Sequence, residues 1–448
     1  MTCLFIPSAG RSAYATLLTL SLAFALTLSA GSARAQTLGN SPYSRLGIGE
    51  AAPGAGLLRN QGMGGTGVAA PTSAYANEIN PALNWHTRYV TFDVGVTGQL
   101  KNLKTATQQQ RTGNGTISYL TLALPITPRW GAVVGLRPLA TVDFENRSEI
   151  GITGDPLGRV EVVNRGEGGL SQAYMSHGIQ VAGGLSVGAE ASFVFGSVET
   201  ANSTRLLAGT NTGESVERTI ILERRRYGDL VLRTGLAYEQ KLPSGVLLTA
   251  GATVQLGSDL HVTRRRLQER RSVALQDQIL ESLLLSDSVR SRSHLPASFT
   301  GGLGVTNEAG TRTFTVEATS QAWSRFRADG IAQRSLTDAW RVAAGGEWTP
   351  DPNSVESYFR RVTYRAGVYG GRNGWRDRAG EALQDAGVTW GFALPLGKVA
   401  TFEGATLQTS FAYGQRGFNS SMGVRESYLR AQIGVAFSSI WFVKRRIE

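Results

Sequence analysis

The stretch Gly62-Met63-Gly64-Gly65-Thr66-Gly67 matches the G-x-G-x-x-G pattern with which Rossmann folds bind the pyrophosphate of a dinucleotide. That chemistry requires an apolar strand before the glycines and a helix after them. No such strand precedes Gly62, and Pro71 interrupts the expected helix. We therefore interpret these glycines as positions where the backbone turns tightly and packs closely against another surface, with no nucleotide cofactor.

Catalytic and metal chemistry has few candidates. The four histidines are His86, His177, His261 and His294. Asp259 and His261 could form an Asp/His pair of the kind some outer-membrane proteases use, although a solvated loop histidine is the simpler interpretation. The pattern H-E-x-x-H and a carboxylate-rich calcium loop do not occur. The sequence therefore predicts a protein that is not an enzyme, with no catalytic residue, metal or cofactor.

The N-terminal residues predict export. Arg11 precedes an apolar run at 17–28, and Ala33-Arg34-Ala35 is a small-x-small cleavage motif. We expect residues 1–35 to be a signal peptide, which would also remove the single cysteine, Cys3. The net charge of the whole chain is +11. In an exported protein this basic balance favours contact with anionic lipid headgroups, including lipopolysaccharide phosphates, rather than with nucleic acid.

Beyond residue 87, apolar and polar residues alternate with period 2. In 88–100, for example, Val90 and Phe92 would face one side of a sheet, while Asp93 and Thr97 would face the other. The alternating runs last about 11 residues, which suits a tilted membrane strand. The fourteen predicted strands are 88–100, 115–125, 130–143, 168–179, 184–198, 227–240, 245–257, 296–307, 311–322, 337–350, 357–371, 386–396, 403–416 and 425–441.

The links between these strands alternate in length. Short turns are followed by long polar links, which we interpret as outer loops; the longest are 144–167, 199–226 and 258–295. Short periplasmic turns and long outer loops are typical of barrels in the outer membrane of Gram-negative cells.

Charged residues on the polar faces of the strands form one group. A charge on the lipid face at mid-depth would cost about 2–4 kcal/mol, so we expect these side chains to point into the lumen. Both signs occur, which favours a pairing network that anchors a plug over a single-sign ring that selects ions. The residues are Asp93, Glu190, Arg233, Glu317, Arg341, Glu347, Arg365 and Arg430.

The chain as a whole resembles the FadL-type outer-membrane transporters of long-chain fatty acids and other hydrophobic compounds. Those proteins begin with a hatch that reads G-M-G-G-A/T-x-x-A and then N-P-A, and here 62–69 and Asn80-Pro81-Ala82 stand in those positions. The residues 70–74 replace the acidic segment usual in the family, so the resemblance predicts the fold better than the cargo.

The resemblance implies an all-β fold: a transmembrane antiparallel barrel of about fourteen strands over 88–448, with residues 36–87 as a hatch in its lumen. In the family a gap in the wall lies at a kink in the third strand. Gly135 and Pro138 fall in the third predicted strand, and proline cannot donate to a ladder, so we expect a lateral opening there. The implied gate residues are Gly62, Met63, Gly64, Gly65, Gly67, Asn80 and Pro81.

Two functions remain open. The first is passive uptake of hydrophobic small molecules, gated by the hatch, with a lateral exit near the strand-three kink. The alternative is a non-transporting scaffold that serves protein secretion or surface attachment through its long outer loops. The expected partners are outer-membrane lipid, lipopolysaccharide, a hydrophobic ligand and, during biogenesis, the barrel-assembly machinery. We expect a monomer.

Overall fold

The computed structural model describes residues 41–52, 56–105, 108–208, 215–377, 379–396, 404–420 and 423–439. The predicted signal peptide, 1–35, lies outside these residues. Within the described part, no helix is both long and apolar enough to cross a bilayer.

Fourteen antiparallel strands close into a barrel, which confirms the predicted fold and strand number. The barrel closes where β19 pairs with β2, from Ser439 opposite Val90 to Arg425 opposite Lys104. Two of the fourteen are interrupted, and each carries two labels. The strands are β2 (Val90–Lys104), β3 (Gln109–Thr127), β4 (Trp130–Gly151), β5 (Arg159–Ala182), β6 (Leu185–Ala208), β7 (Glu217–Lys241), β8 with β9 (Leu247–Gln255, Ser258–Ser272), β10 with β11 (Gln278–Leu295, Ser298–Thr306), β12 (Arg312–Gln321), β15 (Ala339–Trp348), β16 (Thr363–Arg376), β17 (Ala382–Leu396), β18 (Gly404–Arg416) and β19 (Arg425–Ser439).

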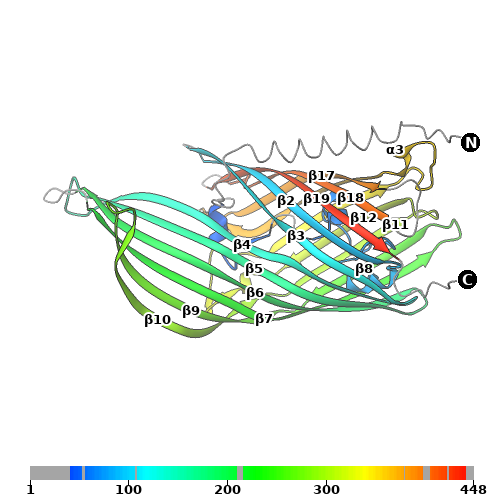
Figure 1. Ribbon diagram of the computed structural model, residues 1–448, viewed down its shortest axis with the longest axis horizontal. Helices are drawn as coiled ribbons and strands as arrows, with labels where there is room; N and C mark the ends of the chain where they lie inside the picture. The colour runs from blue at the N-terminus through cyan, green and yellow to red at the C-terminus, as the bar shows by residue number, and fades with distance from the viewer. Residues whose placement is uncertain are drawn as a thin grey trace, which may run out of the picture. The chain divides into compact units, whose positions relative to one another are not determined.

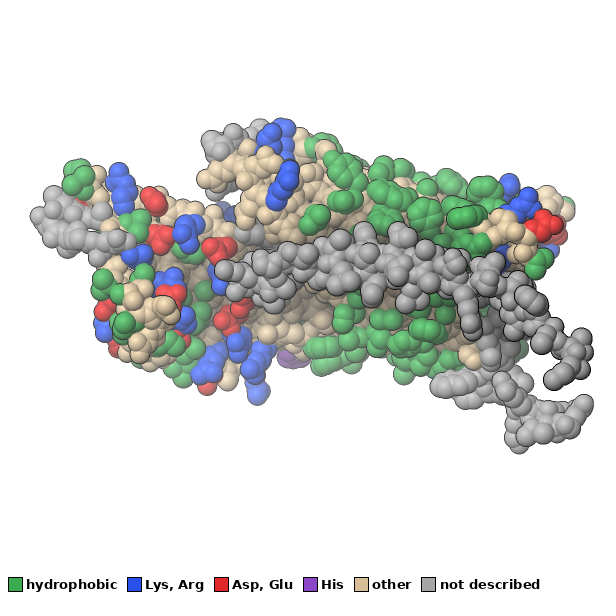
Figure 2. All heavy atoms as spheres, turned by 45° about the horizontal axis from the view of Figure 1, so that its top comes forward, with side chains coloured by type: hydrophobic (Ala, Val, Ile, Leu, Met, Phe, Trp, Pro, Cys, Tyr) green, Lys and Arg blue, Asp and Glu red, His purple; other side chains and the backbone are tan. Residues whose placement is uncertain are grey.

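The predicted alternation places apolar side chains outside and polar ones inside. On β2, Phe92 and Val96 are exposed, whereas Asp93 and Thr97 are buried. On the face that Figure 2 shows, exposed apolar side chains gather in a belt across one part of the barrel, with charged side chains beyond it. This pattern is typical of a membrane barrel with an apolar outer face.

The prediction that the long polar links 144–167, 199–226 and 258–295 are loops is wrong. The chain there is mostly strand, because β4, β5, β6, β7, β9 and β10 continue beyond the apolar belt as a curved sheet (Figure 1). Residues in this sheet extension are solvated on both faces in places, so they lose the simple apolar–polar alternation. The alternation that identifies membrane strands could not identify these.

The ladder between β3 and β4 is short. It runs from Thr127 opposite Trp130 to Leu120 opposite Leu136 and ends there. Beyond that point β3 stays paired with β2, while β4 continues along β5 to Gly151. The β2–β3 hairpin and β4 therefore diverge, as Figure 1 shows. We call this divergence the β3/β4 seam.

Short elements complete the fold. The N-terminal part contains η1 (Pro42–Arg45), β1 (Glu50–Ala51), α2 (Leu58–Gly62) and η2 (Pro81–His86). Between β12 and β15 lie η3 (Trp323–Arg325), β13 (Arg327–Ala328) and β14 (Ile331–Ala332), and α3 (Tyr358–Arg361) lies between β15 and β16. We call residues 41–52 the edge segment and residues 56–86 the lumen segment.

Candidate functional site

The glycine-rich turn at 62–67 binds a carboxylate of the protein's own wall. Glu317 of β12 accepts hydrogen bonds from the backbone N–H groups of Gly67, at 2.8 Å, and Val68, at 3.0 Å. Gly64 donates to Thr389 Oγ1 at 2.8 Å, and Arg341 donates to the Gly64 carbonyl at 2.5 Å. Backbone N–H groups of this turn, which in a dinucleotide site would bind the pyrophosphate, are thus already hydrogen-bonded to side chains of the wall.

Asn80 forms hydrogen bonds both within the lumen segment and to the barrel wall. Its Nδ2 donates to the carbonyls of Val68, at 2.8 Å, and of Leu236 on β7, at 3.0 Å. Its Oδ1 accepts from Ala82 N at 3.0 Å and so caps η2, where Pro81 occupies the first turn. The predicted Asn-Pro pair therefore ends the lumen segment with a capped turn against the wall.

Wall glycines give the lumen segment its room, and sequence reasoning missed them. A Cβ added to Gly188 or Gly178 would collide with the backbone of 81–84, and one added to Gly251 would collide with the Val68 carbonyl. Gly304, Gly345 and Gly367 meet the backbone of residues 63–69 in the same way. The available signal was glycine recurring on the lumen-facing parity of several strands, which marks close backbone approach.

Buried ion pairs join the lumen segment to the wall. Arg59, which is 1% exposed, pairs with Glu347 of β15 at 2.6 Å, and Glu347 also accepts from Arg365 of β16 at 3.2 Å. Arg365 donates to Gln408 at 3.0 Å, and Gln408 donates to Asp93, also at 3.0 Å. The chain of polar contacts thus runs from the segment across four strands.

A second buried group lies beside the seam. Glu190 of β6 pairs with Arg137 of β4 at 2.6 Å and faces Arg233 of β7 at 3.7 Å. Arg233 donates to the Glu78 carbonyl of the lumen segment at 2.8 Å. Seven of the eight predicted lumen charges thus lie in contacts that reach or adjoin the lumen segment. The eighth, Arg430, donates to Gln99 at 3.1 Å without touching it.

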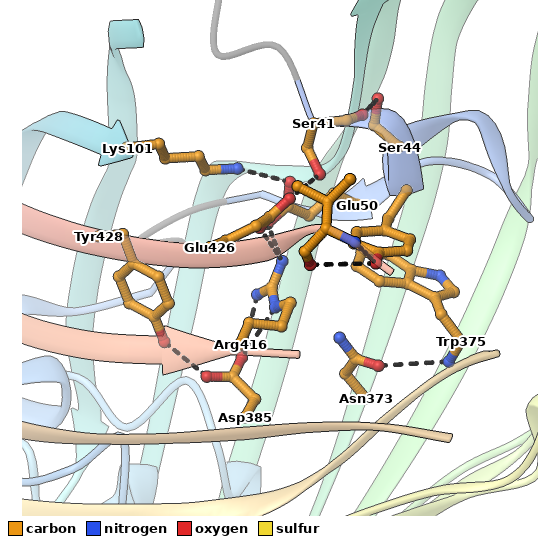
Figure 3. A network of polar contacts seen from close by, with 12 residues as sticks. Ser41, Ser44, Glu50, Lys101, Asn373, Trp375, Asp385, Arg416, Glu426 and Tyr428 are labelled. Atoms are coloured by element: carbon orange, nitrogen blue, oxygen red, sulfur yellow. Dashed lines mark hydrogen bonds and ion pairs between the residues drawn. The ribbon is translucent and has the colours of Figure 1, made fainter. Parts of the chain in front are cut away.

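The edge segment is held by a charged network that sequence reasoning also missed (Figure 3). Glu50 accepts from Lys101 of β2 at 2.8 Å and from Arg416 of β18 at 2.6 Å. Arg416 also pairs with Asp385 at 3.0 Å, and Glu426 accepts from Ser41 at 2.6 Å. Burial alone would raise the pKa of Glu50, but the Lys101 and Arg416 charges outweigh it and hold the pKa at about 2.

The edge segment also occupies the seam. β1 pairs with the edge of β4 that β3 leaves free, with Glu50 opposite Thr141 and Ala51 opposite Ala140. Ala52 N donates to the Leu139 carbonyl at 3.2 Å, and Ser41 N donates to the Asp143 carbonyl at 3.2 Å. The edge segment therefore supplies hydrogen-bond partners to the backbone of β4 in the residues that follow Pro138. At Pro138 the β4–β5 register shifts by a bulge.

An apolar cluster lies beneath the edge segment. Tyr43 and Ile48 are buried in it, and the wall contributes side chains from β4 to β10 and from the β12–β17 region. The wall members are Ala140, Val142, Phe144, Leu170, Val194, Val198, Tyr227, Val231, Leu260, Val262, Leu295, Phe326, Leu336, Trp375 and Leu383. Tyr43 stacks on Trp375 with ring centroids 5.6 Å apart. The region around the edge segment thus holds both this apolar cluster and the charged network of Glu50, whereas the lumen segment is joined to the wall mainly by polar contacts.

Cavities lie on both sides of the edge segment. One of about 210 Å³ is lined by Ile48, Phe144 and Tyr227, among others. Another of about 330 Å³ is lined by Ala52, Arg137, Pro138, Leu139 and Gln172, among others. A wider cavity of about 900 Å³ opens between the β2–β3 hairpin and the free edge of β4, lined by residues 108–110 and 145–149 among others. Gly135 lies at the last β3–β4 pairs, opposite Thr121.

The histidines form no shared centre. His261 contacts Asp229 rather than Asp259, and Asp259 instead contacts His294 at 2.6 Å. His86 lies 2.8 Å from Glu239. Among the residues that the structure describes, no three His, Cys, Asp or Glu side chains are grouped as metal ligands.

A family model described as BamG matches residues 18–448. Among solved structures, the CymD monoaromatic hydrocarbon channel is 16% identical, with 85% of this chain and 97% of that chain covered and a TM-score of 0.53. The Ralstonia pickettii toluene transporter TbuX is 15% identical, with 86% and 98% covered and a TM-score of 0.52. No curated protein sequence matches. At these identities the likeness is one of fold, and it confirms the predicted FadL-type barrel.

Proposed function

The chain belongs to the BamG family, and from this premise and its barrel fold we propose an outer-membrane channel that passes hydrophobic small molecules sideways through the β3/β4 seam. The edge segment is the gate of this channel, and the lumen segment is a fixed plug beneath it. Molecules enter the apolar cluster from outside and leave near Pro138, between β3 and β4.

One observation carries the proposal: the edge segment does two things at once. It fills the apolar cluster with Tyr43 and Ile48, and it pairs with the free edge of β4 through β1. Its withdrawal would therefore expose an apolar chamber and open the adjoining seam together. A small apolar molecule can replace the two side chains in the chamber, because apolar burial is non-directional.

The lumen segment supports a sideways route rather than an axial one. Its displacement would separate Arg59 from Glu347 inside the barrel, and leaving a buried charge unpaired costs about 3–5 kcal/mol. The edge segment is also held by buried ion pairs, from Glu50 to Lys101 and Arg416, but it adjoins the seam, because β1 pairs with the free edge of β4. Motion of the edge segment is therefore the movement that opens a sideways route.

A reversible lock tests the gate. Ala51 and Ala140 lie opposite each other across the β1–β4 pairing, within reach of a disulfide if both are replaced by cysteine. In liposomes, the A51C/A140C variant should take up a labelled monoaromatic hydrocarbon when reduced and lose most of that uptake when oxidised.

The matched control is T306C/T313C, a pair opposed near the turn between β11 and β12 and outside the lining of the cavities beside the edge segment. Its oxidation should leave uptake unchanged. Equal uptake by the oxidised and reduced A51C/A140C protein would exclude the edge segment as the gate. No uptake by either form, across several compound classes, would exclude transport itself.

The name of the matched family favours a second candidate, an association with the barrel-assembly machinery. The sheet extension and the charged, filled inner lumen are compatible with a scaffold that acts through its surface. In cells depleted of this protein, this candidate predicts lower amounts of other outer-membrane barrels with unchanged hydrocarbon uptake. The channel predicts the reverse, and on either candidate we propose a monomeric barrel.

A further inference from the structure

The outermost strand of the sheet extension has an unpaired edge. β10 pairs along its length with β9, but on its other side it meets β13 only where His294 lies opposite Arg327. The Ser291 hydroxyl donates to Asp329 at 2.5 Å, and in the described part of the chain no strand pairs with that side of 278–290. One row of backbone N–H and C=O groups therefore lacks a ladder partner there, which is the usual template for an added strand.

The same strand exposes apolar side chains well beyond the apolar belt. Leu283 is 56% exposed and Ile279 is 51% exposed, and Leu280, Leu284 and Leu285 are exposed as well. Figure 1 shows β9 and β10 in the sheet extension, and Figure 2 shows charged side chains interspersed with apolar ones at that end. A group of leucines in this polar setting marks an interaction surface.

Charge at the base of the edge indicates what binds there. Arg290 and Arg292 are exposed on β10 and form no ion pair with any described residue. Neighbouring arginines of β9 are partly neutralised, for example Arg270 by Glu281 at 3.6 Å and Arg265 by Asp287 at 3.8 Å. The unpaired arginines would complement carboxylates on a partner.

We propose that residues 278–290 of β10 are a docking edge for an extended segment of a protein partner outside the membrane. The segment adds as a further strand next to β10. Its apolar side chains cover Leu283, Leu284 and Leu285, and its carboxylates meet Arg290 and Arg292. A lipid could cover the leucines, but only an extended polypeptide also pairs with the backbone edge.

Bulges in β10 limit the length of the added strand. The register against β9 shifts between Ile279 and Glu281, between Leu284 and Ser286, and again before Val289, and Ser288 has a φ of 54°. Such bulges protect an edge against indiscriminate pairing with identical chains. They restrict the partner to short paired runs, with the leucines supplying further contact.

A synthetic peptide can test this docking edge in the full-length protein in detergent. The probe is a fluorescent peptide of about 12 residues, long enough to follow 278–290, with alternating leucine and threonine and then alternating glutamate and threonine. A second peptide has the same side chains, but its backbone is N-methylated at alternate residues so that one edge cannot donate. Fluorescence anisotropy should show binding of the first peptide and at least about tenfold weaker binding of the second.

Charge reversal gives the second readout. The variant R290E/R292E should weaken the glutamate peptide about tenfold and favour a peptide with lysine in place of glutamate. The matched control R360E reverses an exposed arginine in the β15–β16 link, on the opposite side of the belt, and should bind the glutamate peptide like the unchanged protein.

Three results would overturn the proposal. Equal binding of the N-methylated peptide would show that no strand is added. Equal binding by R290E/R292E would remove the role of the arginines. If the glutamate peptide does not bind, while R290E/R292E loses binding to vesicles containing lipopolysaccharide, the surface contacts lipid instead. None of these results depends on uptake or on barrel assembly, so the docking edge and the proposed functions fail separately.

Discussion

At the scale of single residues, the wall glycines let the lumen segment lie directly against the barrel wall. The interior therefore differs from that of an open channel. Replacing Gly188 by alanine places a Cβ against the backbone of Pro81 and Ala82, where no side chain can rotate away. We expect G188A to push η2 off the wall and to destabilise the folded barrel by about 1–3 kcal/mol, as overpacking does.

Thermal unfolding of the detergent-solubilised protein measures this effect, and limited proteolysis reports release of the lumen segment. The control is G370A, because a Cβ at Gly370 has open space around it. Unchanged stability and protease resistance in G188A would show that the segment does not press on the wall at this position.

Glu347 is the second residue-scale prediction. The substitution E347Q leaves Arg59 and Arg365 buried together without their shared counter-charge, and we expect a loss of about 3–5 kcal/mol in the free energy of unfolding. The control E308Q removes an exposed ion pair in which Glu308 Oε1 lies 3.6 Å from Lys241 Nζ. This substitution should change stability by less than about 1 kcal/mol. Denaturant unfolding of both variants decides; similar losses would contradict the role of burial.

At the scale of elements, the edge segment should respond to acid through Glu50. Its pKa is lowered from 4.5 to about 2 in the folded protein, so its contribution to stability is fully present above pH 4.5. That contribution is lost as the pH falls from 4.5 toward 2. We expect the backbone amides of 41–52 to exchange faster with solvent over this window.

Hydrogen exchange followed by mass spectrometry measures this loosening. In E50Q the edge segment should exchange quickly at neutral pH as well, with little further change on acidification. A pH response in E50Q equal to that of the unchanged protein would place the titrating group elsewhere.

The two N-terminal segments also make opposite predictions for the whole molecule. Deleting 41–52 removes the gate but leaves the lumen contacts, so the barrel should still assemble and should take up hydrocarbon faster. Deleting 56–86 uncovers the wall glycines. It also leaves Glu347, Glu317 and Arg233 without their partners in the lumen segment. We expect little assembled barrel from that variant, measured as folded protein in outer-membrane fractions.

The strand number could be predicted because lipid enforces a strict parity on each membrane strand. That rule stops at the edge of the belt, so the sequence predicts loops at 199–226 and 258–295 although the described residues there are mostly strand. The edge segment escaped prediction because β1 has two residues, too few for any periodicity. Glu50, Lys101 and Arg416 are brought together by barrel closure, which no local pattern of sequence encodes.

The close fit between the lumen segment and the wall also has a consequence for the order in which the protein is built. The lumen segment leads directly into β2, and β2 is the strand that β19 must reach to complete the ring. A segment that entered after this event would have to strip water from Arg59 and Glu347 separately inside a finished wall. We therefore expect the wall to be wound around the segment, which acts as an internal template, and β19 to join β2 last.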